Sequence, residues 1–71
     1  MIKKRDLLEY GFNSMDDYFD YIYDSQINGQ HSQVLELFNA MSITQKANCI
    51  KYFGEMGGEY YQFSLSLLGE L

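Results

Sequence analysis

Carboxylates are the only reactive side chains that gather at short spacing in this sequence. Four of them lie close together on the chain, at Asp16, Asp17, Asp20 and Asp24. Carboxylates in such a group can bind a divalent cation, exchange protons in acid–base catalysis, or present negative charge to a basic partner. The residues between the aspartates decide among these kinds of chemistry.

Those intervening residues have the spacing of an amphipathic helix. The apolar side chains stand at i, i+3, i+4 and i+7, namely Met15, Tyr18, Phe19 and Ile22. The aspartates then fall on an arc nearly opposite this stripe. A calcium loop instead places its ligands along a flexible turn with a glycine at the bend, and acid–base catalysis needs a pocket. The pattern therefore indicates a charged outer helix face and disfavours a metal site or a catalytic pair.

The two other reactive side chains stand alone. His31 is the only histidine and Cys49 the only cysteine. A structural zinc site needs four ligands, and a catalytic thiol needs an activating base beside it. Nothing in the spacing places His31 next to Cys49. We predict a non-enzymatic protein without cofactor or metal, in which His31 lies at a helix start and Cys49 is a small core residue.

Tyrosines border the acidic arc and extend it into a candidate binding surface. Tyr21 and Tyr23 flank the arc on either side. The two rings cannot both be buried if Tyr18 and Ile22 are buried, so at least one of them is exposed. Tyrosine combines apolar area with a polar tip and is enriched at protein interfaces. The predicted partner-binding residues are Asp16, Asp17, Asp20, Tyr21, Tyr23 and Asp24. An ordinary solvated helix face accounts for the same pattern.

The helix that carries this surface has recognisable ends. Ser14 is a suitable N-cap, and Asp17 three residues later resembles a capping box. Asn28-Gly29 supplies residues that tolerate positive φ and is a natural stop. We therefore predict a helix from Ser14 to Ile27.

Three further segments complete the predicted bundle. Residues 2–10 predict a short helix before Gly11, and residues 30–41 predict another with an apolar face. Ser42 and Gln45 form a capping-box pattern before a third helix. The inner face predicted for that helix is Ile43, Ala47, Ile50 and Phe53, with Cys49 beside it.

The last segment permits two structures. Residues 61–67 alternate apolar and polar side chains, which is typical of a half-buried strand, but Tyr61, Leu65 and Leu68 also align on a helix. A strand needs a partner, and no second strand is found in this chain. We therefore predict a helix; the strand alternative would imply pairing across a dimer or onto a target protein. The predicted fold is a single all-α domain over residues 1–71, with four to five short helices.

The distribution of charge narrows the choice of partner and compartment. The net charge is −5, and no Lys or Arg lies between Asp6 and Gln45, where seven acidic residues occur. This charge disfavours nucleic acid as a partner and favours a basic protein surface.

The sequence shows no signal peptide and no apolar run of membrane-spanning length, and its single cysteine gives no sign of a disulfide scaffold. We expect a cytoplasmic protein with no membrane partner.

Two stretches of the chain are similar to short helical proteins of bacteriophages and prophages. They are the run GFNSMDDYFDYI at residues 11–22 and the run INGQHSQ at residues 27–33, which an aliphatic helix follows. The resemblance spans residues 11 to 53. It implies a phage accessory protein that binds and alters a host protein in the host cytoplasm, and it transfers no site residues.

Two functions are compatible with these observations. In the first, the acidic, tyrosine-bordered helix face docks on a basic surface of a host protein that handles nucleic acid, acting as an inhibitor or, in a stronger form, as a DNA mimic. In the second, the chain is a structural or self-assembling protein that forms a homodimer through its C-terminal aromatic segment, with Phe63 and Leu67 at the contact. The acids would then serve only solubility.

Overall fold

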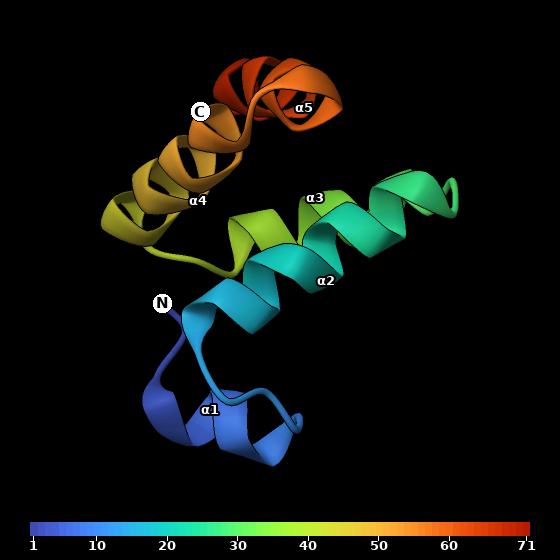
Figure 1. The fold of residues 1–71 in the computed structure, drawn as a ribbon. Helices are drawn as coiled ribbons and strands as arrows, with labels where there is room; N and C mark the ends of the chain where they lie inside the picture. The colour runs from blue at the N-terminus through green and yellow to red at the C-terminus, as the bar shows by residue number, and fades with distance from the viewer.

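The structure, a computed structural model, describes residues 1–71 as five helices without strands (Figure 1). The helices are α1 Lys4–Glu9, α2 Met15–Ile27, α3 His31–Asn39, α4 Ile43–Met56 and α5 Gly58–Leu68. This confirms the all-α prediction and the helical interpretation of the last segment. None of the five helices combines the length and the apolar character that a bilayer span requires.

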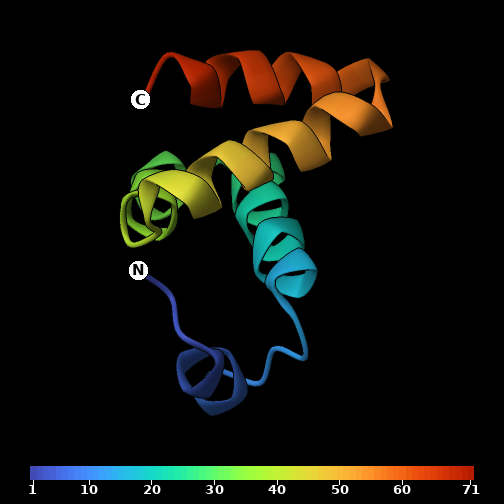
Figure 2. The same cartoon turned by 90° about the vertical axis from the view of Figure 1, so that its left-hand side faces the viewer.

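Two helical hairpins make up most of the molecule. α2 packs on α3 and α4 packs on α5, while α4 also crosses α2 (Figures 1 and 2). The short α1 lies at the end of the molecule away from α5, where it leads into α2 through an irregular loop (Figure 1). The core lies between the hairpins and is strongly aromatic. Its buried apolar side chains are Leu7, Tyr18, Phe19, Ile22, Val34, Phe38, Met41, Cys49, Phe53, Phe63 and Leu67.

The start of α2 follows the capping chemistry of its sequence. The Ser14 hydroxyl accepts a bond from the Asp17 amide at 3.4 Å. The Asp17 carboxylate in turn accepts from the Asn13 amide at 2.9 Å, one residue further back than in the usual capping box. Tyr18 then fixes α2 against α3, because its hydroxyl donates to the Leu37 carbonyl at 2.6 Å. The predicted start and apolar stripe of this helix are confirmed.

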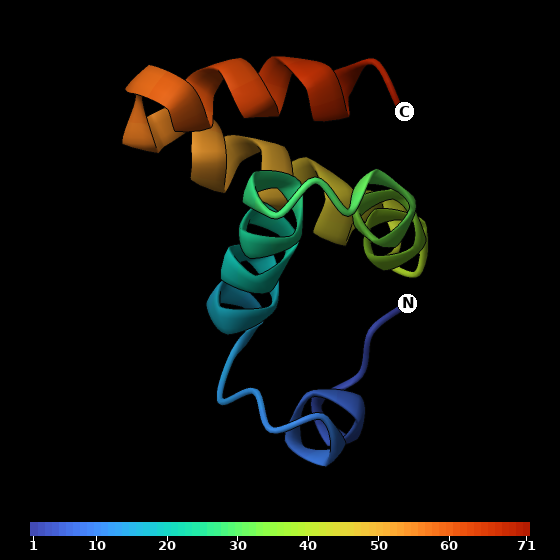
Figure 3. The same cartoon turned by 90° about the vertical axis from the view of Figure 1, so that its right-hand side faces the viewer.

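The turn between α4 and α5 brings these two helices close at one end only. Gly57 and Gly58 both have positive φ, at 74° and 58°, so the chain reverses within two residues. Just before the turn, a Cβ added at Gly54 would lie 3.7 Å from the Ser64 hydroxyl oxygen. From this contact the two helices diverge (Figures 2 and 3).

This divergence corrects the inner face predicted for α4. Phe53 and Cys49 are fully buried and Ile50 is half-buried, as expected. The prediction was wrong for Ile43, which is 77% exposed, and for Ala47, which is also exposed. Both lie in the first half of α4, where α5 has moved away, so the residues that periodicity assigns to a helix contact have no helix against them.

One side chain anchors the N-terminal segment to the rest of the molecule. Gln45 closes the predicted capping box, since its Oε1 accepts from the Ser42 amide at 2.9 Å. The same oxygen accepts from the Ile2 amide at 2.9 Å, and its Nε2 donates to the Ile2 carbonyl at 2.7 Å. Together with the burial of Leu7, these bonds hold α1 in place.

We expect Gln45→Glu to release the N-terminal segment while keeping the cap of α4. The carboxylate still accepts from the Ser42 amide, but it cannot donate to the Ile2 carbonyl and is repelled by it. The loss should be about 1 kcal/mol, the net value of a typical hydrogen bond. Amide hydrogen exchange measured by NMR should become faster at Leu7 and Leu8. Thr44→Glu, with the same change of charge one residue away, is the control, and unchanged protection at Leu7 in Gln45→Glu would contradict the anchor.

Candidate functional site

The aspartates of α2 fall into two groups with different surroundings. Asp16, Asp20 and Asp24 stand four residues apart, so they form one row along the helix, about 6 Å of rise from each to the next. All three are exposed. Asp17 is half-buried, and its carboxylate accepts a hydrogen bond from the Asn13 amide at the start of the helix. We call Asp16, Asp20 and Asp24 the acidic row.

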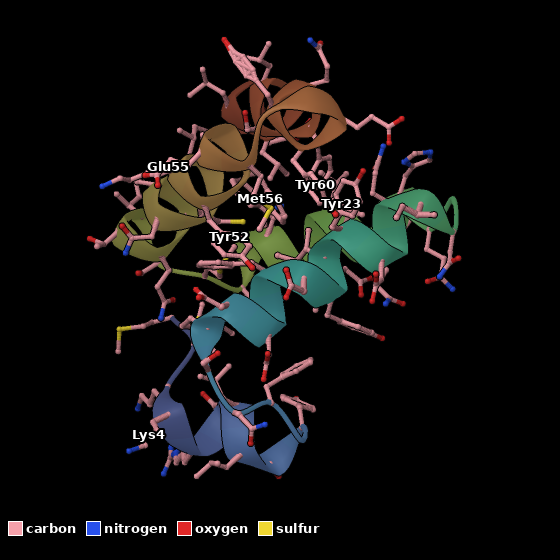
Figure 4. The ribbon with its side chains drawn as sticks, viewed as in Figure 1. Lys4, Tyr23, Tyr52, Glu55, Met56 and Tyr60 are labelled. Atoms are coloured by element: carbon pink, nitrogen blue, oxygen red, sulfur yellow. The ribbon has the colours of Figure 1, made fainter.

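A tyrosine of α4 holds the middle of the acidic row. The Tyr52 hydroxyl donates to Asp20 Oδ1 at 2.8 Å across the α2–α4 crossing, where Figure 4 shows Tyr52 between the two helices. Burial, the bond to Asp20 and the charges of Asp16 and Asp17 raise the pKa of Tyr52 to about 12. The hydroxyl therefore keeps its proton at neutral pH and remains a donor. Periodicity places Tyr52 on the side of α4 opposite Ile43, and it gives no information on which helix crosses there.

Tyr21 lies at the border of α2 and α3, where an aromatic contact and a hydrogen bond hold its side chain. Its side chain is 41% exposed, which confirms that at least one of the two flanking tyrosines faces solvent. The ring packs on Phe12 with 5.6 Å between centroids. The hydroxyl accepts from Gln33 Nε2 at 2.9 Å, and the same nitrogen donates to the buried Ser25 hydroxyl. Tyr21 is thus an accessible ring in a fixed position.

Tyr23 has a different role from Tyr21, because its ring packs between the hairpins. It lies 4.3 Å from the ring of Tyr60, 5.5 Å from Phe63 and 5.8 Å from Phe53, measured between centroids. Figure 4 shows Tyr23 of α2 beside Tyr60 of α5. Burial, followed by the nearby Glu59 carboxylate, raises the pKa of Tyr23. Of the six residues predicted for the binding surface, Tyr23 is the one whose ring joins α2 to both helices of the other hairpin.

A surface groove of about 340 Å³ runs beside the acidic row, between α2 and α4. Its lining residues are Met15, Asp16, Phe19, Gln45, Asn48, Lys51, Tyr52 and Glu55. At its rim Lys51 and Glu55 form the only ion pair of the chain, 3.9 Å apart and largely exposed, so this pair holds the rim weakly. The groove gives a docking partner an apolar floor next to the first carboxylate of the row.

The remaining reactive groups, His31 and Cys49, lie in different surroundings. No three His, Cys, Asp or Glu side chains lie together as metal ligands. His31 is exposed at the first position of α3, as predicted. Cys49 is fully buried, and burial raises the pKa of its thiol to about 12, so the nucleophilic thiolate is suppressed.

The two C-terminal residues assigned from the sequence to a dimer contact are core residues. Phe63 is 6% exposed and Leu67 is 2% exposed. The exposed large apolar side chains of α5 are instead Tyr60, which packs on Tyr23, and Tyr61, Leu65 and Leu68. A surface for self-association on this helix therefore has to use the second group.

Comparison of the chain with protein-family models, with curated proteins and with solved structures found no match. The geometry described above is the basis for the functional proposal.

Proposed function

We propose that this chain is a non-enzymatic interaction module that docks its acidic row on a basic surface of a host protein. The observation that carries the proposal is the state of the three carboxylates: all are exposed, all lie on one side of one helix, and none forms an ion pair within the chain. Charges in this state have not been neutralised by folding and are available to a partner. The bacteriophage-like stretches of the sequence suggest that the partner belongs to a host cell.

The local structure supports docking because it fixes the row before a partner arrives. Asp20 is held by the Tyr52 hydroxyl, and the first turn of α2 is held by the cap at Ser14. A surface that is ordered in advance loses less conformational entropy on binding. Tyr21 adds an accessible ring beside the charges, which suits an interface that combines ion pairs with apolar contact.

A stronger form of the proposal is inhibition by mimicry of DNA. The row from Asp16 to Asp24 spans about 12 Å of helix axis. This length corresponds to roughly three to four nucleotides of one DNA strand, at 3.4 Å for each. Carboxylates in such a row would occupy the phosphate positions of a nucleic-acid-binding channel, and a host protein that handles nucleic acid would be inhibited in the cytoplasm.

Charge reversal at the two ends of the row tests the docking proposal. Asp16 and Asp24 are exposed and their side chains make no hydrogen bond within the chain, so Asp16→Lys combined with Asp24→Lys should leave the fold intact. Affinity capture from a bacterial lysate with the wild-type chain should retain a basic protein at low salt and release it as salt rises above roughly 0.1 M, where the Debye length falls to about 10 Å. The double variant should retain at least about tenfold less, since two favourable charge pairs become repulsive.

The matched control changes the net charge by the same amount elsewhere. Glu36 on α3 and Glu70, two residues after the end of α5, are both exposed, and Glu36→Lys with Glu70→Lys should capture the same protein as the wild type. Equal capture by the row variant, or equal loss in the control, would overturn docking through the row. Duplex DNA added to the captured complex distinguishes the stronger form, because a DNA mimic is displaced by DNA and a ligand of another basic surface is not.

A further inference from the structure

The open end of the α4–α5 hairpin exposes apolar side chains that have the spacing of a helix–helix contact. Near the turn the two helices touch at Gly54 and Ser64. On α4, Ala47 and Ile43 continue the line of Gly54, at seven and eleven residues before it. On α5, Leu68 lies one turn beyond Ser64. Both lines therefore run from the contact into the region where the helices diverge (Figures 2 and 3).

The side chains along these two lines are exposed to solvent in a single copy of the chain. Ile43 is 77% exposed, the highest value among the large apolar side chains, and Leu68 is 52% exposed. Leu65 and Tyr61, on the same side of α5 as Leu68, are exposed as well. We call Ile43, Ala47, Tyr61, Leu65 and Leu68 the apolar face. A group of exposed apolar side chains, rather than a single exposed leucine, marks a candidate interaction surface.

The distribution of charge around the apolar face indicates what can cover it. No Asp, Glu, Lys, Arg or His belongs to the face, and at 100° per residue Glu59, the one carboxylate of α5, points to the opposite side of that helix. A basic partner would find no carboxylate here. A chain of net charge −5 repels its own copies, and pairing through a face without acids avoids bringing carboxylates of two copies together. The apolar face meets that condition.

We propose that two copies of this chain pair through the apolar face, with α4 and α5 of one copy against α4 and α5 of its partner. A two-fold symmetric arrangement places the same lines of each copy in contact and turns two open hairpins into a four-helix bundle. This proposal is independent of the docking function. Tyr52, which bonds to the acidic row, lies nine residues after Ile43 and so on the opposite side of α4. The dimer therefore leaves both acidic rows accessible.

The mass of the protein in solution, measured by sedimentation velocity and light scattering, tests the dimer. Association by mass action should raise the mass from 8.3 kDa toward twice that value as the concentration increases from about 5 to about 500 µM. Ile43→Glu and Leu68→Glu should each shift this rise to at least about tenfold higher concentration, because each buries an unpaired carboxylate in the dimer. Ile43 opens α4, where the helix dipole favours a carboxylate, so Ile43→Glu should retain full helicity by circular dichroism.

A third variant tests whether the loss of dimerisation is specific to the apolar face. Leu8 is exposed on α1, away from the α4–α5 hairpin, and Leu8→Glu should dimerise like the wild type. A wild-type chain that stays at 8.3 kDa over the whole range would overturn the proposal. So would a dimer that persists in both Ile43→Glu and Leu68→Glu, or one that Leu8→Glu abolishes, since either result would place the contact elsewhere.

Discussion

Replacing Phe53 by alanine is expected to lower the free energy of unfolding by about 3–5 kcal/mol, the usual cost of removing a buried aromatic ring. Phe53 is completely buried where α2, α4 and α5 meet. Its ring contacts four other rings, those of Tyr23, Tyr52, Tyr60 and Phe63. A domain of this size has a total stability of about 4–10 kcal/mol, at 0.05–0.15 kcal/mol for each residue. The variant should therefore be largely unfolded or close to it.

Urea denaturation followed by circular dichroism measures this loss. It is best done at low micromolar concentration, where self-association contributes little. Ile43→Ala is the matched control, because Ile43 lies on the same helix with most of its side chain in solvent, and its change should stay within about 0.5 kcal/mol. Similar losses in the two variants would contradict the assignment of Phe53 to the centre of the core.

Raising the pH from 9 to 12 is expected to remove several kcal/mol of stability. Burial raises the pKa of the Cys49 thiol from 9.0 to about 12, and burial is also the main cause that raises the pKa of Tyr18 from 10.0 to about 12. The unfolded chain therefore releases these protons first, and alkali favours it. The stability is fully present below pH 9 and is lost as the pH rises toward 12. Cys49, which is fully buried, contributes about 3–4 kcal/mol of this loss.

Urea denaturation at a series of pH values tests this dependence. In the wild type the free energy of unfolding should begin to fall near pH 9, the ordinary pKa of the thiol. In Cys49→Ala the fall should begin near pH 10, where the tyrosines start to ionise in the unfolded chain. If Cys49→Ala loses stability between pH 9 and 10 as steeply as the wild type, the thiol is not the source.

The sequence predicted the features of α2 that depend only on neighbours along the chain. Its cap at Ser14, its apolar stripe and its stop after Ile27 all follow from local periodicity and capping chemistry, and all are confirmed. The same local signals predicted the cap at Ser42. They also placed the carboxylates of α2 opposite its apolar stripe, where the acidic row is exposed.

Features set by the crossing of helices could not be predicted in this way. Periodicity places Tyr23 at the border of its helix and Tyr52 on the outer side of α4, but it does not say which neighbour each one meets. The bond from Tyr52 to Asp20 joins residues 32 positions apart, and the bonds from Gln45 to Ile2 join residues 43 apart. The predicted burial of Ile43 was wrong for a related reason. The exposure of this side chain depends on the angle between α4 and α5, and the spacing of apolar residues does not indicate that angle.

The two-hairpin arrangement has a consequence for how the chain folds. α2 and α3 are joined by three residues and α4 and α5 by one, so each hairpin closes over a short stretch of chain at a small entropic cost. Proteins dominated by such local contacts fold in microseconds to milliseconds. We expect each hairpin to form early and the aromatic joint between Tyr23 and Tyr60 to close last. The acidic row, which lies wholly on α2, would then be assembled before the molecule is complete.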